Sequence, residues 1–180
     1  IIDPSTTFYK VRELLRISDY DVHKKFAKDI CQINNHELLH LNKKLNLTWN
    51  EIKSLSQNIL VEIGGHTMHH VSLNYLSEKQ SGNQILDSKN ELERQIDKPV
   101  NHFAFPYGSL DDASAKEYKL LTKFGFKSAV YNHPGGIYKN TPPYQFPRLG
   151  LSDETTLSRL NQFFSGQLHL NFNGLNKTIG

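Results

Sequence analysis

From residue 49 onward the sequence predicts an α/β fold in which helices cover a parallel sheet, arranged as an open sheet or as part of a barrel. Short apolar runs rich in β-branched and aromatic residues alternate with longer segments in which apolar side chains recur every three or four positions. Glycine, proline or polar residues follow each strand-like run, as expected where a buried strand ends in a loop. Such alternation is typical of parallel strands joined by helices.

The N-terminal part of the chain, residues 1–47, looks helical and loop-like instead. Val22, Phe26 and Ile30 recur at four-residue spacing, which predicts an amphipathic helix that begins near Ser18 or Asp19. We therefore interpret the 180 residues as a single domain. Its expected parts are a helical lead-in or insertion over 1–47, a core over 48–165 and a C-terminal tail over 166–180.

The core begins with a helix and a strand that have clear local signals. A capping-box pattern at 48–51, in which Thr precedes Glu by three positions, predicts the start of a short helix. The β-prone run 59–63 then predicts a buried strand, closed by Gly64 and Gly65. A second capping box at 77–80 opens the next helix. The remaining expected elements are a strand at 103–105, a helix capped by Asp111 or Asp112 and stopped by Gly125, a strand at 127–131, a Pro-rich loop at 134–147, and a helix from Ser152 through Phe164.

Composition and charge exclude several classes of function. The 21 Lys and Arg residues are scattered between 18 Asp and Glu residues, for a net charge of +3. Nucleic-acid binding requires basic residues gathered on one face with aromatic residues among them, so we expect no nucleic-acid partner. No apolar stretch approaches the roughly 18 residues that cross a bilayer, so we expect no transmembrane segment.

One histidine pair matches a known zinc-peptidase pattern. His36, Glu37 and His40 fit H-E-x-x-H, in which both histidines bind zinc from one helical face and the glutamate acts as general base. The G-x-x-H continuation of one large peptidase class is missing after His40. The alternative is a surface helix with exposed histidines. A zinc peptidase therefore stays open as an alternative function.

A second pair, His66 and His70, has the same spacing and a more informative position. His66 follows the predicted strand 59–63, and Tyr107 follows the strand 103–105. Arg148 lies in a loop after the strand 127–131. Ligands gather at the carboxyl ends of parallel strands, so these residues are expected at one edge of the sheet. Loop histidines bound to backbone groups are the alternative reading of the pair.

The segment Glu62-Ile-Gly-Gly-His-Thr-Met-His-His70, followed by Phe103-Ala-Phe-Pro-Tyr-Gly108, resembles the polysaccharide deacetylases of carbohydrate esterase family 4, the NodB homology domain. The resemblance covers roughly residues 48–165. It implies a distorted (β/α)7 barrel, and metal-dependent removal of N-acetyl groups from amino sugars in a polysaccharide or glycan. It also implies a location outside the cytoplasm or at the cell envelope.

By this resemblance, His66 and His70 match the histidines of the family's H-[S/T]-x-x-H motif and would bind a divalent metal, expected to be zinc. Thr67 would hold the loop by a hydrogen bond, and His69 would be a bystander between the ligands. The backbone N–H of Tyr107, in the P-Y-G turn, would help to bind the oxyanion of the tetrahedral intermediate.

Two further catalytic residues are expected on weaker matches to the family. Arg148 would supply a charge at the edge of the site, because the Arg that precedes P-Y-G in many relatives is replaced here by Ala104 or Phe105. His169, in Leu168-His169-Leu170, is the candidate for the general acid of the family's late Leu-His motif.

The family's first motif, a strand that ends in an Asp pair, is absent before residue 48. In relatives that pair supplies the general base and the third metal ligand. We therefore expect the chain to lack the first strand or two of the barrel, with an upstream segment or another chain supplying the Asp ligand. The remaining alternative is an inactive, carbohydrate-binding remnant of the same fold.

Overall fold

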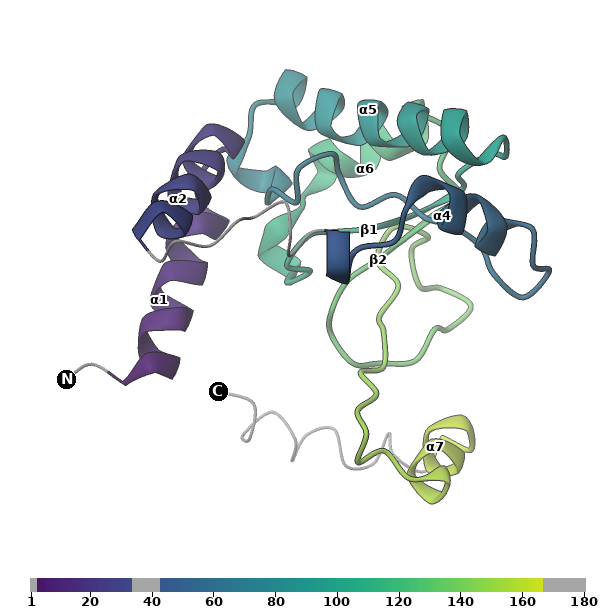
Figure 1. Cartoon of the computed structure of the whole chain (residues 1–180). Helices are drawn as coiled ribbons and strands as arrows, with labels where there is room; N and C mark the ends of the chain where they lie inside the picture. The colour runs from purple at the N-terminus through teal and green to yellow at the C-terminus, as the bar shows by residue number, and fades with distance from the viewer. Residues whose placement is uncertain (1–2, 34–42, 167–180) are drawn as a thin grey trace.

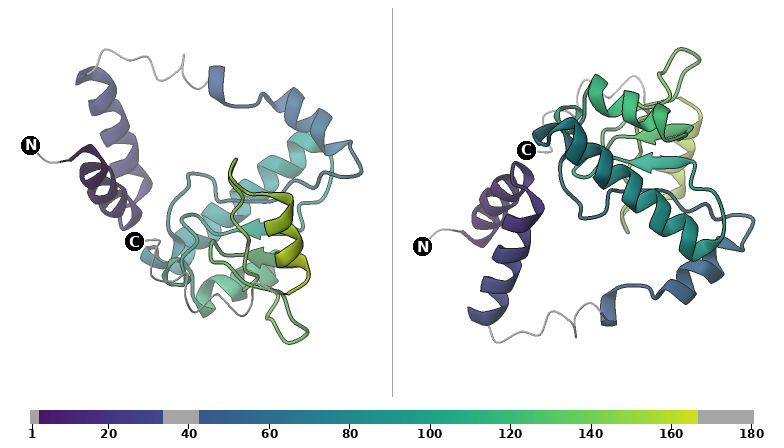
Figure 2. Two further views of the ribbon diagram at one scale, coloured as in Figure 1. Left: turned by 90° about the horizontal axis from the view of Figure 1, so that it is seen from below. Right: turned by 90° about the horizontal axis from the view of Figure 1, so that it is seen from above.

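The structure is a computed structural model that describes residues 3–33 and 43–166. Figure 1 shows helices α5 and α6 above a small sheet, with long loops on the sheet's other side. Helices α1 and α2 stand to one side of this core, as the views in Figure 2 confirm. The elements in chain order are α1 (Pro4–Arg16), α2 (Tyr20–Ile33), α4 (Trp49–Ser56), η1 (Leu73–Tyr75), α5 (Glu78–Ile96), β1 (His102–Ala104), η2 (Leu110–Asp112), α6 (Ala115–Lys123), β2 (Ser128–Val130) and α7 (Leu157–Phe164).

The sheet consists of β1 and β2, which run parallel with Phe103 opposite Ala129. Two isolated parallel bridges widen it, because Gly65 pairs with Phe103 on one side and Val130 pairs with Phe146 on the other. Four chain segments therefore lie side by side in parallel, and the predicted parallel arrangement is confirmed. The two strands lie within one or two residues of their predicted bounds.

The strand predicted at 59–63 does not form, and the chain joins the sheet only at Gly65. Asn58 turns the chain here, because its side-chain oxygen accepts a hydrogen bond from the N–H of Leu60 at 2.9 Å and its carbonyl accepts one from Val61 at 3.1 Å. Ile59 and Leu60 are consequently 98% and 88% exposed. The apolar run predicted burial, but the polar residue before it determines the backbone path.

The core lies between the sheet and helices α5 and α6. Phe103 and Phe105 of the β1 segment meet Phe126 and Tyr131 edge-on or tilted, with ring centroids 4.6 to 5.5 Å apart. Burying one such side chain stabilises the fold by about 1.5–3 kcal/mol. The buried apolar residues of this core come from α5, α6, both strands and the loops between them: Leu73, Ile85, Ile96, Val100, Phe103, Phe105, Ala113, Leu120, Leu121, Phe126, Ala129 and Tyr131.

Local capping signals account for three of the helix starts. Thr48 and Glu51 form the predicted capping box of α4, and Ser77 and Gln80 form that of α5. The prediction that Asp111 or Asp112 caps the next helix is wrong. Ser114 takes that position in α6, and its N–H and hydroxyl both donate to a Glu117 carboxylate oxygen at 2.9 Å.

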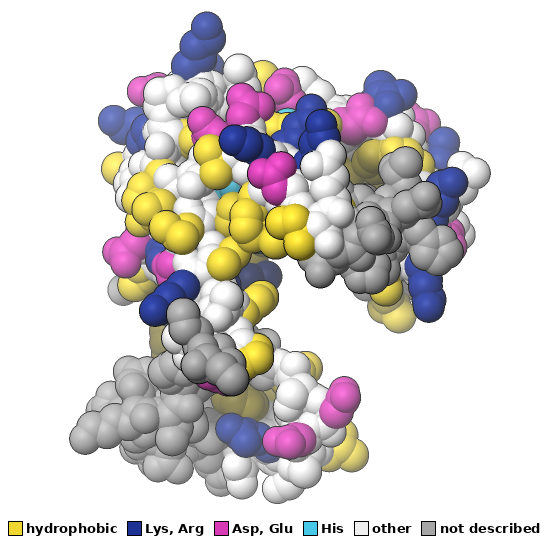
Figure 3. Space-filling model, turned by 60° about the vertical axis from the view of Figure 1, so that its left-hand side comes forward, with side chains coloured by type: hydrophobic (Ala, Val, Ile, Leu, Met, Phe, Trp, Pro, Cys, Tyr) yellow, Lys and Arg dark blue, Asp and Glu magenta, His cyan; other side chains and the backbone are white. Residues whose placement is uncertain are grey.

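Helices α1 and α2 are joined by a short turn. Asp3 caps α1, with its carboxylate accepting from the N–H of Thr6 at 3.0 Å, and Pro4 occupies the first helical position, which suits its fixed φ. Helix α2 begins next to Asp19, as predicted. On the side of the molecule where these helices stand, exposed hydrophobic side chains gather between charged ones (Figure 3). No helix in the described ranges has the length and apolar character needed to cross a membrane.

Candidate functional site

The loop after Gly65 carries the histidine pair and is held against the carboxyl end of β1. Nδ1 of His66 lies 2.7 Å from the carbonyl oxygen of Ala104. A carbonyl only accepts, so Nδ1 carries a proton, and in the neutral form of the ring the lone pair is on Nε2. Metal-binding histidines usually donate such a hydrogen bond from the ring nitrogen that does not bind the metal. The bond fixes the tautomer and the orientation of the ring.

His70 is placed close to His66 by a tightly turned loop. The two ring centroids lie 4.9 Å apart at an interplanar angle of 74°. Thr67 and His70 both adopt positive φ, 62° and 55°, which is uncommon for residues other than glycine. Partial burial, followed by the neighbouring His66, lowers the pKa of His70. Its imidazole is therefore neutral at pH 7, the form that binds metals.

Two expectations for this loop need correction. Thr67 was expected to hold the loop, but its hydroxyl is buried without a hydrogen-bond partner among the described residues. His69 is a structural residue rather than a bystander. Gln84 of α5 donates to Nδ1 of His69 at 2.9 Å and accepts from its backbone N–H at 3.0 Å. The ring also stacks on Tyr20 of α2, with centroids 3.7 Å apart.

Tyr107 faces His70 from the P-Y-G turn at the end of the β1 segment. The two ring centroids lie 5.1 Å apart. Tyr107 and Gly108 have φ of 60° and 77°, and the N–H of Gly108 donates to the carbonyl of Pro106 at 2.6 Å. This turn leaves the backbone N–H of Tyr107 with no acceptor in the described part of the chain. Burial raises the pKa of the Tyr107 phenol, so the hydroxyl stays protonated at neutral pH.

Arg148 lies at the same edge of the sheet but makes different contacts. Its Nε donates to the carbonyl of Tyr131, just beyond β2, at 3.0 Å, and its N–H donates to the carbonyl of His133 at 2.9 Å. The structure thus places His70 against both His66 and Tyr107, and it ties Arg148 to the neighbouring strand end. His169 and the peptidase pattern His36, Glu37 and His40 lie outside the described residues.

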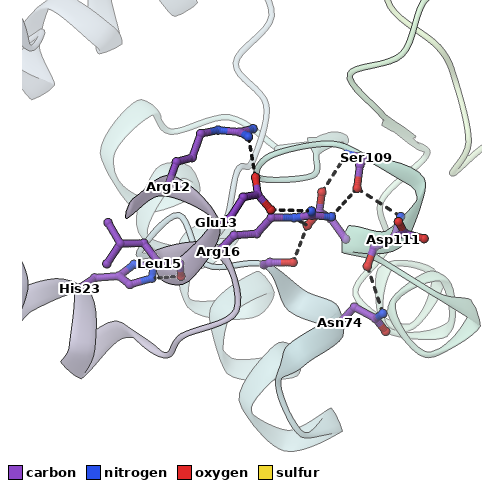
Figure 4. A network of polar contacts seen from close by, with 10 residues as sticks. Arg12, Glu13, Leu15, Arg16, His23, Asn74, Ser109 and Asp111 are labelled. Atoms are coloured by element: carbon purple, nitrogen blue, oxygen red, sulfur yellow. Dashed lines mark hydrogen bonds and ion pairs between the residues drawn. The ribbon is translucent and has the colours of Figure 1, made fainter. Parts of the chain in front are cut away.

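Sequence reasoning missed a buried carboxylate beside this group. Asp112 is 1% exposed and accepts hydrogen bonds from Arg16 of α1 and from Ser72 and Ser109. Figure 4 shows Arg16 reaching from α1 toward Ser109, and Arg12 beside it. Arg12 also lies over the Tyr107 ring, 5.5 Å from its centroid. The pattern Ser109-x-x-Asp112 was a readable turn signal, but nothing local indicated an arginine as the partner.

The ion pair predicts how stability depends on pH. Burial alone would raise the pKa of Asp112, but hydrogen bonds from Arg16, Ser72 and Ser109 outweigh it and hold the pKa below the ordinary 3.8. A carboxyl group whose pKa is lower in the folded state contributes its full stabilisation at pH values above its unfolded-state pKa. This stabilisation is lost as the pH falls through the folded-state pKa. We expect the free energy of unfolding, measured by urea titration, to fall below about pH 4. Asp112→Asn should lack this component, whereas Asp111→Asn, which changes an exposed carboxylate, should retain it; equal profiles for the two variants would contradict the assignment.

In residues 3–33 and 43–166, no group of three or more His, Cys, Asp or Glu side chains is placed to hold a metal ion. The pair His66 and His70 nevertheless has the donor chemistry of a partial site. Both imidazoles are at the carboxyl edge of the sheet, one with its tautomer fixed and the other held neutral. Catalytic zinc generally takes three protein ligands, so this pair alone would not complete a catalytic zinc site.

Comparison with known proteins gives a consistent picture. A family model described as polysaccharide deacetylase matches residues 6–129. A putative polysaccharide deacetylase, YxkH, from Bacillus subtilis (strain 168) is 25% identical over 109 residues, which span 61% of this chain and 38% of that protein. The chain therefore covers well under two thirds of the length of this curated relative.

Solved structures share the fold. A deacetylase from Streptococcus pyogenes, PplD in complex with acetate, superposes with a TM-score of 0.60 at 20% identity, over 65% of this chain and 50% of that one. A polysaccharide deacetylase from Bacillus cereus superposes with a TM-score of 0.55 at 24% identity, over 64% of this chain and 36% of that one.

Proposed function

Because the chain belongs to the polysaccharide deacetylase family, we propose that it hydrolyses the amide bond of N-acetylated amino sugars in a polysaccharide or glycan. The observation that carries this proposal is the arrangement of His66, whose Nδ1 is committed to Ala104, with His70 and Tyr107. Two imidazoles and a backbone N–H that has no acceptor among the described residues thus lie at one edge of the sheet. We further propose that the four parallel segments belong to a distorted (β/α)7 barrel.

We propose that His66 and His70 bind a divalent metal, zinc for preference. When bound, such an ion polarises the amide carbonyl and lowers the pKa of water. Two histidines are too few for a catalytic zinc site, so we propose that an Asp pair from outside the described residues supplies the third metal ligand and the general base. An upstream segment or another chain would provide that residue.

The chain's own residues provide the rest of the proposed mechanism. The N–H of Tyr107 donates a hydrogen bond to the oxygen that becomes negative as water adds to the carbonyl. Removal of one oxyanion-hole donor, measured for a side-chain amide, costs about 2.7–4 kcal/mol of transition-state stabilisation. Arg148 adds positive charge at the same edge, and His169 is proposed to donate the proton that the departing amine needs.

Metal content tests the site directly. We expect the purified protein to bind zinc or cobalt, and the double variant His66→Ala, His70→Ala to lose that metal because both imidazole donors are gone. His102→Ala is the matched control, since His102 lies at the opposite end of β1 and bonds Ser128. Unchanged metal content in the double variant would eliminate the proposed site.

Activity is tested on N-acetylglucosamine oligomers, with any segment that precedes Ile1 in its gene included. Acetate release that depends on His66 and His70 is expected. Absence of acetate release from that longer protein would argue against deacetylation. Glycan binding that is independent of metal, without turnover, would select the carbohydrate-binding alternative instead.

A further inference from the structure

The carboxylate of Asp112 connects three separate parts of the candidate site. Oδ1 accepts hydrogen bonds from Nε of Arg16 at 2.7 Å and from the hydroxyl of Ser72 at 2.6 Å. Oδ2 accepts from the backbone N–H of Ser109 at 2.8 Å. Arg16 also donates to the hydroxyl of Ser109 at 2.6 Å, so the same cluster is closed on itself (Figure 4).

The partners of Asp112 are close in sequence to the proposed functional residues. Ser72 follows His70 by two positions, and Ser109 follows Tyr107 by two positions. Arg16 is the last residue of α1, the helix whose Arg12 lies over the Tyr107 ring. One buried carboxylate therefore spans the histidine loop, the P-Y-G turn and the N-terminal helix.

Both loops need such a restraint because their backbones are unusual. His70 and Tyr107 adopt φ of 55° and 60°, and non-glycine residues persist there only where the surrounding structure over-determines them. Asp112 binds next to each of them, and its own position is determined by burial and by the Arg16 guanidinium.

We propose that Asp112 is a positioning residue, which holds the ring of His70 against the ring of Tyr107 and so sets the metal ligand relative to the oxyanion donor. The role of Asp112 in catalysis rests on the proposed function, whereas its role in holding the two rings together does not. An amide does not replace the carboxylate here, because it presents one acceptor and one donor. Its NH₂ group would face either the Ser109 N–H or the Arg16 guanidinium, both of which donate.

The decisive measurement is the contact between the two rings in solution, by NMR on the metal-free protein. Cross-peaks between ring protons of His70 and Tyr107, assigned with His70→Ala, are expected in the unaltered protein at their 5.1 Å separation. We expect Asp112→Asn and Ser72→Ala to lose or strongly weaken them. Asp111→Asn, at the neighbouring exposed carboxylate, and Ser88→Ala, at a buried serine that bonds within α5, are the matched controls and should keep them.

Ser72→Ala keeps the Arg16–Asp112 ion pair, so it decides the question if Asp112→Asn fails to fold. Unchanged cross-peaks in folded Ser72→Ala would show that Asp112 stabilises the fold without positioning the two rings, and would overturn the proposal. Zinc affinity separates this from the proposed function. If the protein binds no zinc even with any segment that precedes Ile1 in its gene included, the function proposed above fails while the ring contact still tests Asp112. If it binds zinc, Ser72→Ala should bind about 10- to 100-fold more weakly, as for other residues that orient metal ligands.

Discussion

Replacing Gly108 with Ala is expected to reduce the free energy of unfolding by about 2–5 kcal/mol. Gly108 has φ of 77°, where a Cβ costs about 1–2 kcal/mol. That Cβ would lie 2.6 Å from Cβ of Asn132 and 2.7 Å from its backbone N, distances at which the backbone must move. Movement is resisted because the N–H of Asn132 donates to the Gly108 carbonyl at 2.7 Å, and forced overpacking adds about 1–3 kcal/mol.

Urea denaturation checks this result, with Gly125→Ala as the control. Gly125 has the same φ of 77° but nothing within 4 Å of the added Cβ. The Gly125→Ala variant should therefore lose only the stability that the positive φ costs. If both variants lose the same free energy of unfolding, the close approach of the P-Y-G turn to Asn132 adds nothing to the destabilisation of Gly108→Ala. A larger loss at Gly108 would show that the turn is fixed by contact with the end of β2.

Replacing Arg16 with Ala is expected to destabilise the protein by about 3–5 kcal/mol, since breaking a buried pair leaves an uncompensated charge. The Asp112 side chain is 0% exposed and the Arg16 side chain 16% exposed, with Nε and Oδ1 2.7 Å apart. Water therefore has little access to the carboxylate once the guanidinium is gone. The expected loss is a large part of the total stability of a typical domain.

Arg94→Ala is the control for charge removal without burial. Arg94 pairs with Glu91 on the surface of α5, with 66% of its side chain exposed, and solvent-screened surface pairs of this kind contribute little to stability. Thermal or urea unfolding of both variants at one salt concentration makes the comparison. A loss at Arg16 no greater than at Arg94 would mean that the buried pair does not hold α1 to the core.

Local signals in the sequence predicted much of the fold correctly. The capping boxes at Thr48 and Ser77 involve residues three apart, so the sequence contains the whole interaction. The strand prediction at 59–63 failed because β-propensity describes how side chains fit a sheet, whereas Asn58 bends the backbone through its own hydrogen bond. The capping role expected of Asp112 failed because a distant arginine determined its position.

The candidate site was predictable where topology alone brings residues together. Carboxyl ends of parallel strands meet at one edge, and this rule correctly placed His66, Tyr107 and Arg148 there. It says nothing about the residues that hold them. Gln84 of helix α5 binds the loop residue His69, and their 15-residue separation leaves no periodic trace in the sequence.

The pairing of Arg16 with Asp112 joins residues 96 positions apart, and this separation bears on folding kinetics. Closing so long a loop costs chain entropy before the contact returns any stabilisation, so contacts of this kind tend to form after the local ones. An interaction that forms after the transition state governs the unfolding rate more than the folding rate. The attachment of the N-terminal helix would then set the lifetime of the native state, while the order in which the core assembles is decided by α5, α6 and the two strands on which they pack.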